Sequence, residues 1–170
     1  AIDAAARGAT DGLRLAVNVG AMLIAFVAIV ALINALFGWA GGLFGMPELS
    51  MEWLLGHLLS PLAWVMGIDW ADCQFAGAQL GVKTVLNEFI AYGNLAGNLA
   101  VDGGISGRSA VILTYALCGF ANFSSIAIQL GGIGAIAPSR RSDLARLGLR
   151  AMIAGNLAAF MTACVVGILL

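Results

Sequence analysis

Long runs without a charged residue constrain this chain more than any other feature of its sequence. No Lys, Arg, Asp or Glu occurs in residues 15–47, 109–139 or 151–170. A helix needs about 20 apolar residues to cross the hydrocarbon core of a bilayer, and each run is long enough. Only 10% of the residues are charged and 61% are hydrophobic, whereas about 25% are charged in an ordinary soluble domain. The sequence therefore predicts an all-α membrane protein.

Three membrane-spanning segments follow from these runs. We expect a first transmembrane helix over residues 13–37, after a cytoplasmic lead-in over residues 1–12. A second span covers residues 108–137, and a last transmembrane helix covers residues 140–170. Because the chain starts without Met and reaches an apolar run almost at once, we expect it to be a fragment of a longer protein.

Arginines predict how these segments are oriented. Arg7 and Arg14 precede the uncharged run of the first span, and four more arginines, at positions 140, 141, 146 and 150, precede the uncharged run of the last one. The positive-inside rule places both groups in the cytoplasm. The chain is therefore expected to be multi-pass, with its C-terminus outside.

Residues 37–72 are expected outside because they contain no Lys or Arg and hold all four tryptophans. Tryptophan is enriched at the membrane–water interface. Within this stretch, residues 50–67 are expected to form an interfacial helix. The alternative, a further span, is disfavoured because Glu52, His57 and Pro61 interrupt the segment.

The segment of residues 71–101 does not fit a single crossing. If it crossed once, the next span would leave the later arginine cluster outside, against the positive-inside rule. A hairpin of two half-helices, each about 14 residues or roughly 20 Å long, enters and leaves on one side and keeps every loop where the charges predict it. We therefore expect a re-entrant hairpin that opens outward, with its tip near residues 86–88.

Glu88, at the expected tip, is the leading functional candidate. A carboxylate at membrane depth is costly unless it is paired or faces a wet cavity, so its presence indicates a function. Gln79, Lys83 and Asn87 recur every four residues and form a polar stripe on one helix face. The alternative is structural: Lys83 and Glu88 satisfy each other, or they cap exposed backbone at the tip.

Residues 119–125, with the sequence GFANFSS, interrupt the span over residues 108–137. Glycine, asparagine and two serines favour an unwound segment, which a membrane tolerates only where the segment lines a cavity. We expect a discontinuous helix whose Asn122, Ser124 and Ser125 hydrogen-bond a polar solute. The alternative is that a serine hydroxyl bonds back to its own helix.

Other classes of protein fit the sequence less well. Cys73, Cys118 and Cys164 are far apart and odd in number, so neither a disulfide framework nor a zinc site is predicted. A net charge of −1 without a basic tract gives no support for nucleic-acid binding, and no cleavable signal peptide is visible. We expect neither enzyme activity nor a cofactor.

Two blocks of residues carry a resemblance to a known family. Residues 81–92, GVKTVLNEFIAY, resemble the signature G-x-K-x-x-x-N-E-F-V-A-Y of the concentrative nucleoside transporters, with Ile90 in place of Val. Residues 116–125, ALCGFANFSS, resemble a second block of that family. With further similarity in the first span and before the last one, the resemblance covers almost the whole chain.

The resemblance implies a cation-coupled nucleoside symporter, with this chain as its C-terminal half and one of two inverted repeats. It implies that Glu88, Asn122 and Ser125 bind the ribose hydroxyls of a nucleoside such as uridine, and that Phe120 lines the same pocket. The supporting polar residues would be Gln79, Lys83, Asn87 and Ser124.

The resemblance also implies partners and a location. The coupling ion, sodium or a proton, and the base of the nucleoside are expected to bind mainly to residues outside this chain, so no metal site is expected within it. The complete protein is expected to be a homotrimer in a lipid bilayer, the bacterial inner membrane. Purine or pyrimidine preference does not follow from this chain.

Two other functions stay open at this point. A channel or gating subunit of a membrane complex would use Lys83 and Glu88 to line or close a pore. A membrane scaffold without transport activity would use the same polar residues only to hold its helices together.

Overall fold

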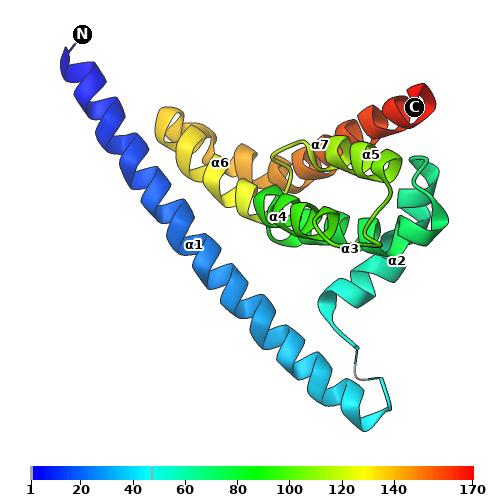
Figure 1. Cartoon of the computed structure of the whole chain (residues 1–170). Coiled ribbons are helices and arrows are strands. Elements are labelled where there is room, and N and C mark those ends of the chain that lie inside the picture. Colours follow the sequence, from blue (N-terminus) through cyan, green and yellow to red (C-terminus); the bar gives the residue numbers. More distant parts are fainter. Residues whose placement is uncertain (1, 47) are drawn as a thin grey trace.

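The computed structural model describes residues 2–46 and 48–170 (Figure 1). No strand occurs in these residues, which confirms the all-α prediction. The elements run in the order α1 (Ile2–Leu43), α2 (Met51–Val65), η1 (Trp70–Asp72), α3 (Cys73–Val85), α4 (Glu88–Leu99), α5 (Gly107–Leu117), α6 (Phe123–Ile136), η2 (Pro138–Arg140) and α7 (Arg141–Leu169).

The first helix, α1, is 42 residues long and runs as a separate rod beside the body formed by α2 to α7 (Figure 1). It contacts that body near its middle, where Val30 is buried. It begins at Ile2, so the lead-in expected over residues 1–12 is helical as far as it is described. Alanine is a strong helix former, and Arg7 forms an ion pair with Asp3 one turn earlier, which favours helix in this segment. The side of a membrane on which it lies stays a prediction.

Asn34 ties α1 to the start of α2. Its Nδ2 donates to Glu52 Oε2 at 2.7 Å, and its Oδ1 accepts from the backbone N–H of Met51 at 2.8 Å. Ser50 caps the same helix by accepting from the N–H of Trp53 at 3.0 Å. The N–H groups of a first helical turn have no partner within the helix, so these side chains fix where α2 begins.

Helix α2 packs closely against α3 through small residues. Gly56 and Gly77 face each other, and a Cβ added at Gly77 would lie 2.6 Å from the carbonyl oxygen of Gly56. Ser60 of α2 is buried in the same contact, and its backbone nitrogen would lie 2.9 Å from that Cβ. One face of α2 is therefore packed against α3. The interfacial position expected for residues 50–67 stays a prediction.

Helices α3 and α4 form a pair separated by Leu86 and Asn87. Asn87 caps α4, because its Oδ1 accepts from the N–H of Ile90 at 3.0 Å. Further along the pair, Asn94 Nδ2 donates to Gln79 Oε1 at 2.9 Å and links the two helices. The chain thus turns at residues 86–87, within the segment expected as a hairpin. That the pair enters a membrane and leaves it on the same side stays a prediction.

A second interruption, at residues 118–122, separates α5 from α6. Gly119 has φ +145°, a conformation that side-chain-bearing residues rarely adopt. The sequence predicted unwinding over residues 119–125, but Ser124 and Ser125 lie in the first turn of α6. The difference arises because the Asn122 side chain accepts from the N–H of Ser125 at 2.7 Å and starts the helix there.

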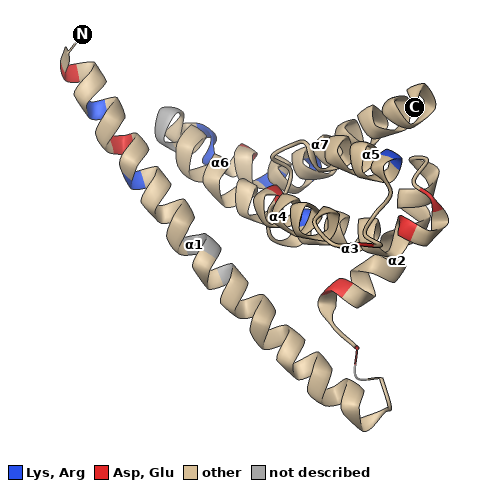
Figure 2. Ribbon diagram, in the orientation of Figure 1, with Lys and Arg blue, Asp and Glu red and all other residues tan. Residues whose placement is uncertain are grey.

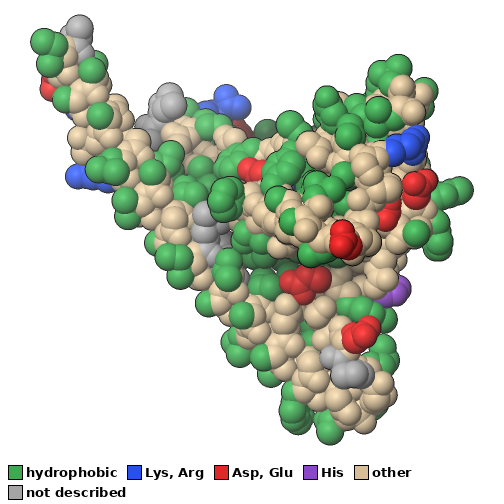
Figure 3. All heavy atoms as spheres, in the orientation of Figure 1, with side chains coloured by type: hydrophobic (Ala, Val, Ile, Leu, Met, Phe, Trp, Pro, Cys, Tyr) green, Lys and Arg blue, Asp and Glu red, His purple; other side chains and the backbone are tan. Residues whose placement is uncertain are grey.

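Many large hydrophobic side chains are exposed on the surface. Charged side chains are sparse along the ribbon (Figure 2), and hydrophobic side chains cover much of α1 and the body (Figure 3). In the described residues one helix, Pro138–Leu169, is long and apolar enough to cross a membrane, and an 18-residue stretch within it has a mean hydropathy of 2.0. Two shorter apolar helical stretches are Val27–Leu43 and Phe123–Gly134. Helix α7 therefore has the length and composition that a membrane-spanning helix needs.

We predict that Gly77→Ala destabilises the protein by about 1–3 kcal/mol, because the added methyl group overpacks the contact with α2. Thermal unfolding of the purified protein in detergent measures the effect. Gly93→Ala is the matched control, since Gly93 lies inside α4 and a Cβ there meets nothing within 4 Å. The control is expected to keep or raise the melting temperature. Equal melting temperatures for the two variants would contradict the close α2–α3 packing.

Candidate functional site

The two helix interruptions meet at Glu88 and Asn122. Glu88 is the first residue of α4, Asn122 caps α6, and Asn122 Nδ2 donates to Glu88 Oε2 at 2.9 Å. Glu88 is half-buried. Its other oxygen, Oε1, makes no hydrogen bond within the residues that the structure describes. The contact therefore leaves one carboxylate oxygen free to accept a hydrogen bond from a polar solute.

The orientation of Asn122 is set by the start of α6. The side chain is completely buried. Its Oδ1 accepts from the Ser125 N–H and from the Ser124 hydroxyl, both at 2.7 Å. Because the oxygen is used in this way, the NH₂ group is the part of the amide that faces Glu88. Helix capping and the contact with the carboxylate are thus made by one side chain.

The two serines have different partners. The Ser125 hydroxyl donates to the backbone carbonyl of Asn122 at 2.6 Å and accepts from the Asn122 N–H at 3.3 Å, which is the local bonding considered as an alternative for one serine. The Ser124 hydroxyl lies 3.5 Å from the carbonyl oxygen of Leu86 at the turn of the α3–α4 pair. Because its one proton is donated to Asn122 Oδ1, Ser124 supports the Asn122 amide and lies beside the turn of the α3–α4 pair.

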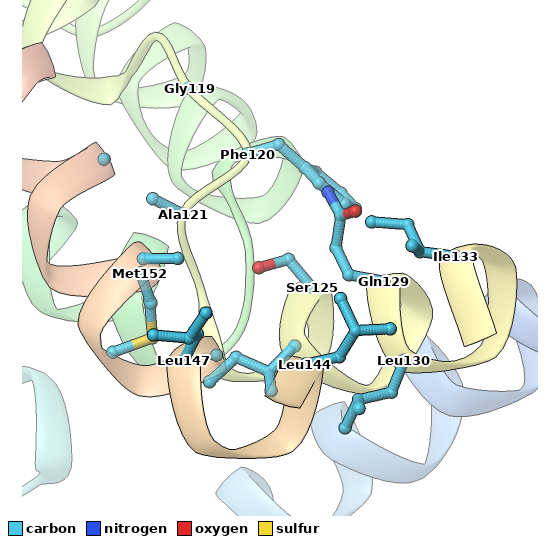
Figure 4. Close-up of a pocket in the computed structure, with 14 residues that line it drawn as sticks. Gly119, Phe120, Ala121, Ser125, Gln129, Leu130, Ile133, Leu144, Leu147 and Met152 are labelled. Carbon is cyan, nitrogen blue, oxygen red and sulfur yellow. The ribbon is translucent and has the colours of Figure 1, made fainter. Parts of the chain in front are cut away.

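Phe120 and Ser125 line a cavity of about 370 Å³ between α6 and α7. In Figure 4, Phe120 and Gln129 lie on one side of this space and Leu147 and Met152 lie across it. Most of the wall is apolar. Glu88 is not part of this wall. Ser125 lines the cavity and is hydrogen-bonded to Asn122, so the cavity lies next to the Glu88–Asn122 contact.

The expected polar stripe is only partly present: Gln79 and Lys83 lie on α3, but α3 ends at Val85 and Asn87 has extended backbone because it caps α4. All three side chains make contacts within the protein. Gln79 accepts from Asn94 of α4, and Asn87 caps α4. Lys83 Nζ donates to the carbonyl oxygen of Ala116 at 2.9 Å. The ion pairs in the described residues are Arg7–Asp3, Arg140–Asp143 and Arg146–Asp143. Lys83 and Glu88 therefore do not satisfy each other by direct pairing.

Three residues near the interruptions were not singled out from the sequence. Asn156 of α7 donates to the carbonyl oxygen of Ala121 at 2.9 Å, and the Tyr92 hydroxyl donates to the carbonyl oxygen of Thr114 at 2.8 Å. Gln129 lines the cavity. Asn156 and Gln129 each stand within an uncharged run, and an isolated amide in such a run is the signal that could have identified them.

Comparison with known proteins identifies the family. A family profile described as "Na+ dependent nucleoside transporter C-terminus" matches residues 1–167. The chain is 52% identical over 166 residues to the uncharacterized transporter YutK of Bacillus subtilis, covering 98% of this chain and 40% of YutK. It is 41% identical over 180 residues to sodium/nucleoside cotransporter 1 of Oryctolagus cuniculus, covering 99% of this chain and 27% of that protein. The chain thus spans less than half the length of these curated relatives.

A solved structure of CNTnw in an inward-facing substrate-bound state has the same fold. The TM-score is 0.89 at 46% sequence identity, and the match covers 98% of this chain and 40% of that one. A match of this extent includes both the α3–α4 pair and the interrupted helix α5–α6. The chain belongs to the concentrative nucleoside transporter family and matches the C-terminal region of its members.

Proposed function

We propose that the full-length protein carries nucleosides across a membrane by sodium-driven secondary active symport, and that this chain supplies the ribose-binding half of the site. The observation that carries the proposal is the contact between Glu88 and Asn122, which places a carboxylate and an amide where two helices begin. The description of the matching family, a Na+ dependent nucleoside transporter C-terminus, supports the solute class and the ion.

A carboxylate suits the neighbouring hydroxyl groups of a ribose. Glu88 Oε1 is available as an acceptor, and hydrogen bonds to an ionised acceptor are roughly twice as strong as neutral ones. In the proposed site Glu88 accepts hydrogen bonds from the ribose hydroxyls, and Asn122 holds the carboxylate in place. Phe120 and Ser125 line the adjoining cavity. A nucleoside that lacks both hydroxyls is therefore expected to bind weakly.

The proposal includes an arrangement in the membrane. The α3–α4 pair is re-entrant and opens outward, α2 lies at the interface, and the C-terminus is outside, as the positions of the arginines favour. The length and hydropathy of α7 support its role as a span. The complete protein would add an inverted repeat of this half and assemble as a homotrimer in a bacterial inner membrane, as the family resemblance implies.

We predict that Glu88→Gln in the full-length transporter raises the KM for uridine about 10-fold to 100-fold, because a hydrogen bond to a charged group contributes about 1.5–3 kcal/mol. The variant should also lose much of the discrimination between uridine and 2′,3′-dideoxyuridine. Radiolabelled uptake with competition by the dideoxy compound measures both quantities, normalised to the amount of transporter in the membrane.

Wild-type uptake, KM and discrimination in Glu88→Gln would contradict the role of Glu88 as the ribose anchor. Currents that follow the voltage linearly, without concentrative uptake, would favour the channel subunit in which Lys83 and Glu88 line a pore. Loss of assembly in a protein that binds no nucleoside would favour the scaffold.

A second prediction separates the cap from the carboxylate contact. Asn122→Ser retains a good helix cap but removes the amide that donates to Glu88. Uridine KM is expected to rise by about fivefold or more, while the melting temperature stays close to that of the wild type. Ser50→Ala is the control, since it removes the cap of α2 at Trp53 and should lower stability without changing KM. Equal KM values in Asn122→Ser and the wild type would show that the amide does not support binding.

A third prediction concerns the coupling ion. We place the sodium site mainly in the rest of the full-length protein, as the family resemblance implies. Replacing external Na+ by choline at constant ionic strength should abolish concentrative uridine uptake into vesicles. Collapse of the proton gradient with an ionophore should leave uptake in place. The reverse pattern would establish proton coupling instead.

A further inference from the structure

Lys83 is a buried cation that the proposed binding site does not use. Its side chain is 0% exposed, and an ammonium group removed from water is costly unless hydrogen bonds replace its hydration. Its partners are the carbonyl oxygen of Ala116 at 2.9 Å and the ring of Phe160, whose centroid lies 5.4 Å from Nζ. One side chain of α3 therefore contacts both α5 and α7.

The carbonyl that Lys83 binds belongs to the last turn of α5, next to the unwound segment. Last-turn carbonyls have no partner within their own helix. Two of them, those of Ala116 and Thr114, are bound by Lys83 from α3 and by Tyr92 from α4. Both helices of the α3–α4 pair therefore hold the same turn of α5.

The two charged residues in the middle of the chain occupy matching places at the helix ends. Lys83 lies in the last turn of α3 and binds the last turn of α5. Glu88 lies in the first turn of α4 and binds the cap of α6. A helix favours a cation at its C-terminus and an anion at its N-terminus. Each charged side chain thus lies at the end of its own helix and contacts the end of a second helix. The two side chains form no direct ion pair with each other.

The position of the unwound segment depends on this arrangement. Ala116 is four residues before Phe120 and six before Asn122 along the chain. A Cβ added at Gly119 would lie 3.9 Å from Lys83 Nζ, so the ammonium group also lies beside the segment itself. Displacement of the α5 end would therefore displace the amide that holds the Glu88 carboxylate.

We propose that Lys83, assisted by Tyr92, is a positioning residue of the nucleoside site: by holding the last turn of α5 it sets where Phe120 and Asn122 lie relative to Glu88. This inference rests on the function proposed above. Lys83 does not touch the solute. Its effect reaches the ribose through the geometry of Glu88 and Asn122.

The test uses Lys83→Met and Tyr92→Phe in the full-length transporter. Uridine KM, the maximal rate per transporter in the membrane, and the selectivity for uridine over 2′,3′-dideoxyuridine are measured for each variant. Lys83→Met is expected to raise KM about tenfold or more and to lower the selectivity. Tyr92→Phe is expected to raise KM about threefold and also to lower the selectivity. Thr84→Val is the matched control, because the Thr84 hydroxyl donates to Leu80 of its own helix. It should stay within about twofold of the wild type.

A fall in maximal rate or membrane level with unchanged KM and selectivity would overturn the proposal, because that result is expected if Lys83 only stabilises the fold. If Lys83→Met does not reach the membrane, Tyr92→Phe decides: shifted KM and selectivity support the proposal, and wild-type values overturn it. Glu88→Gln is measured in parallel. If it behaves as expected while the Lys83 and Tyr92 variants do not, only this inference fails. If it has no effect, the ribose anchor itself fails and the inference fails with it.

Discussion

Two helical segments of this chain stop inside the fold and start again a few residues later, and the backbone groups freed at both breaks need hydrogen-bond partners. In the proposed arrangement both breaks lie within the membrane, where water is absent, so those partners must come from the protein. Asn87 and Asn122 cap the helices that restart. Lys83, Tyr92 and Asn156 bind carbonyl oxygens at the second break. Helices α3, α4, α5 and α7 must lie close together for these side chains to reach.

The same contacts explain why a carboxylate can occupy this place. The beginnings of α4 and α6 each carry partial positive charge, and they meet at Glu88 and Asn122. An anion is favoured there without a directly paired cation, so one oxygen of Glu88 stays available to a solute. The ends of α3 and α5 carry partial negative charge, which favours a cation, and the Lys83 ammonium group lies there. The groups that stabilise the interrupted helices are therefore also those of the proposed half-site.

Much of this arrangement follows from the sequence, because uncharged runs and isolated polar residues in them are strong signals. Glu88 and Asn122 could be identified in this way, and so could the interruption near Gly119. The residue at which that interruption ends could not be predicted, because it depends on whether the Asn122 side chain accepts a hydrogen bond from the backbone N–H of Ser125. The partner of Lys83 could not be predicted either, since Ala116 offers only a backbone carbonyl, which every residue has.

The central claim is that the ribose hydroxyls bind at the meeting point of α4 and α6. An experimental structure of the full-length protein with bound uridine tests it most directly. We predict that ribose hydroxyl oxygens lie about 2.5–3 Å from the Glu88 carboxylate, with the Asn122 amide still in contact with that carboxylate. A bound nucleoside whose ribose contacts neither residue, with Glu88 and Asn122 bonded only to each other, would contradict the account.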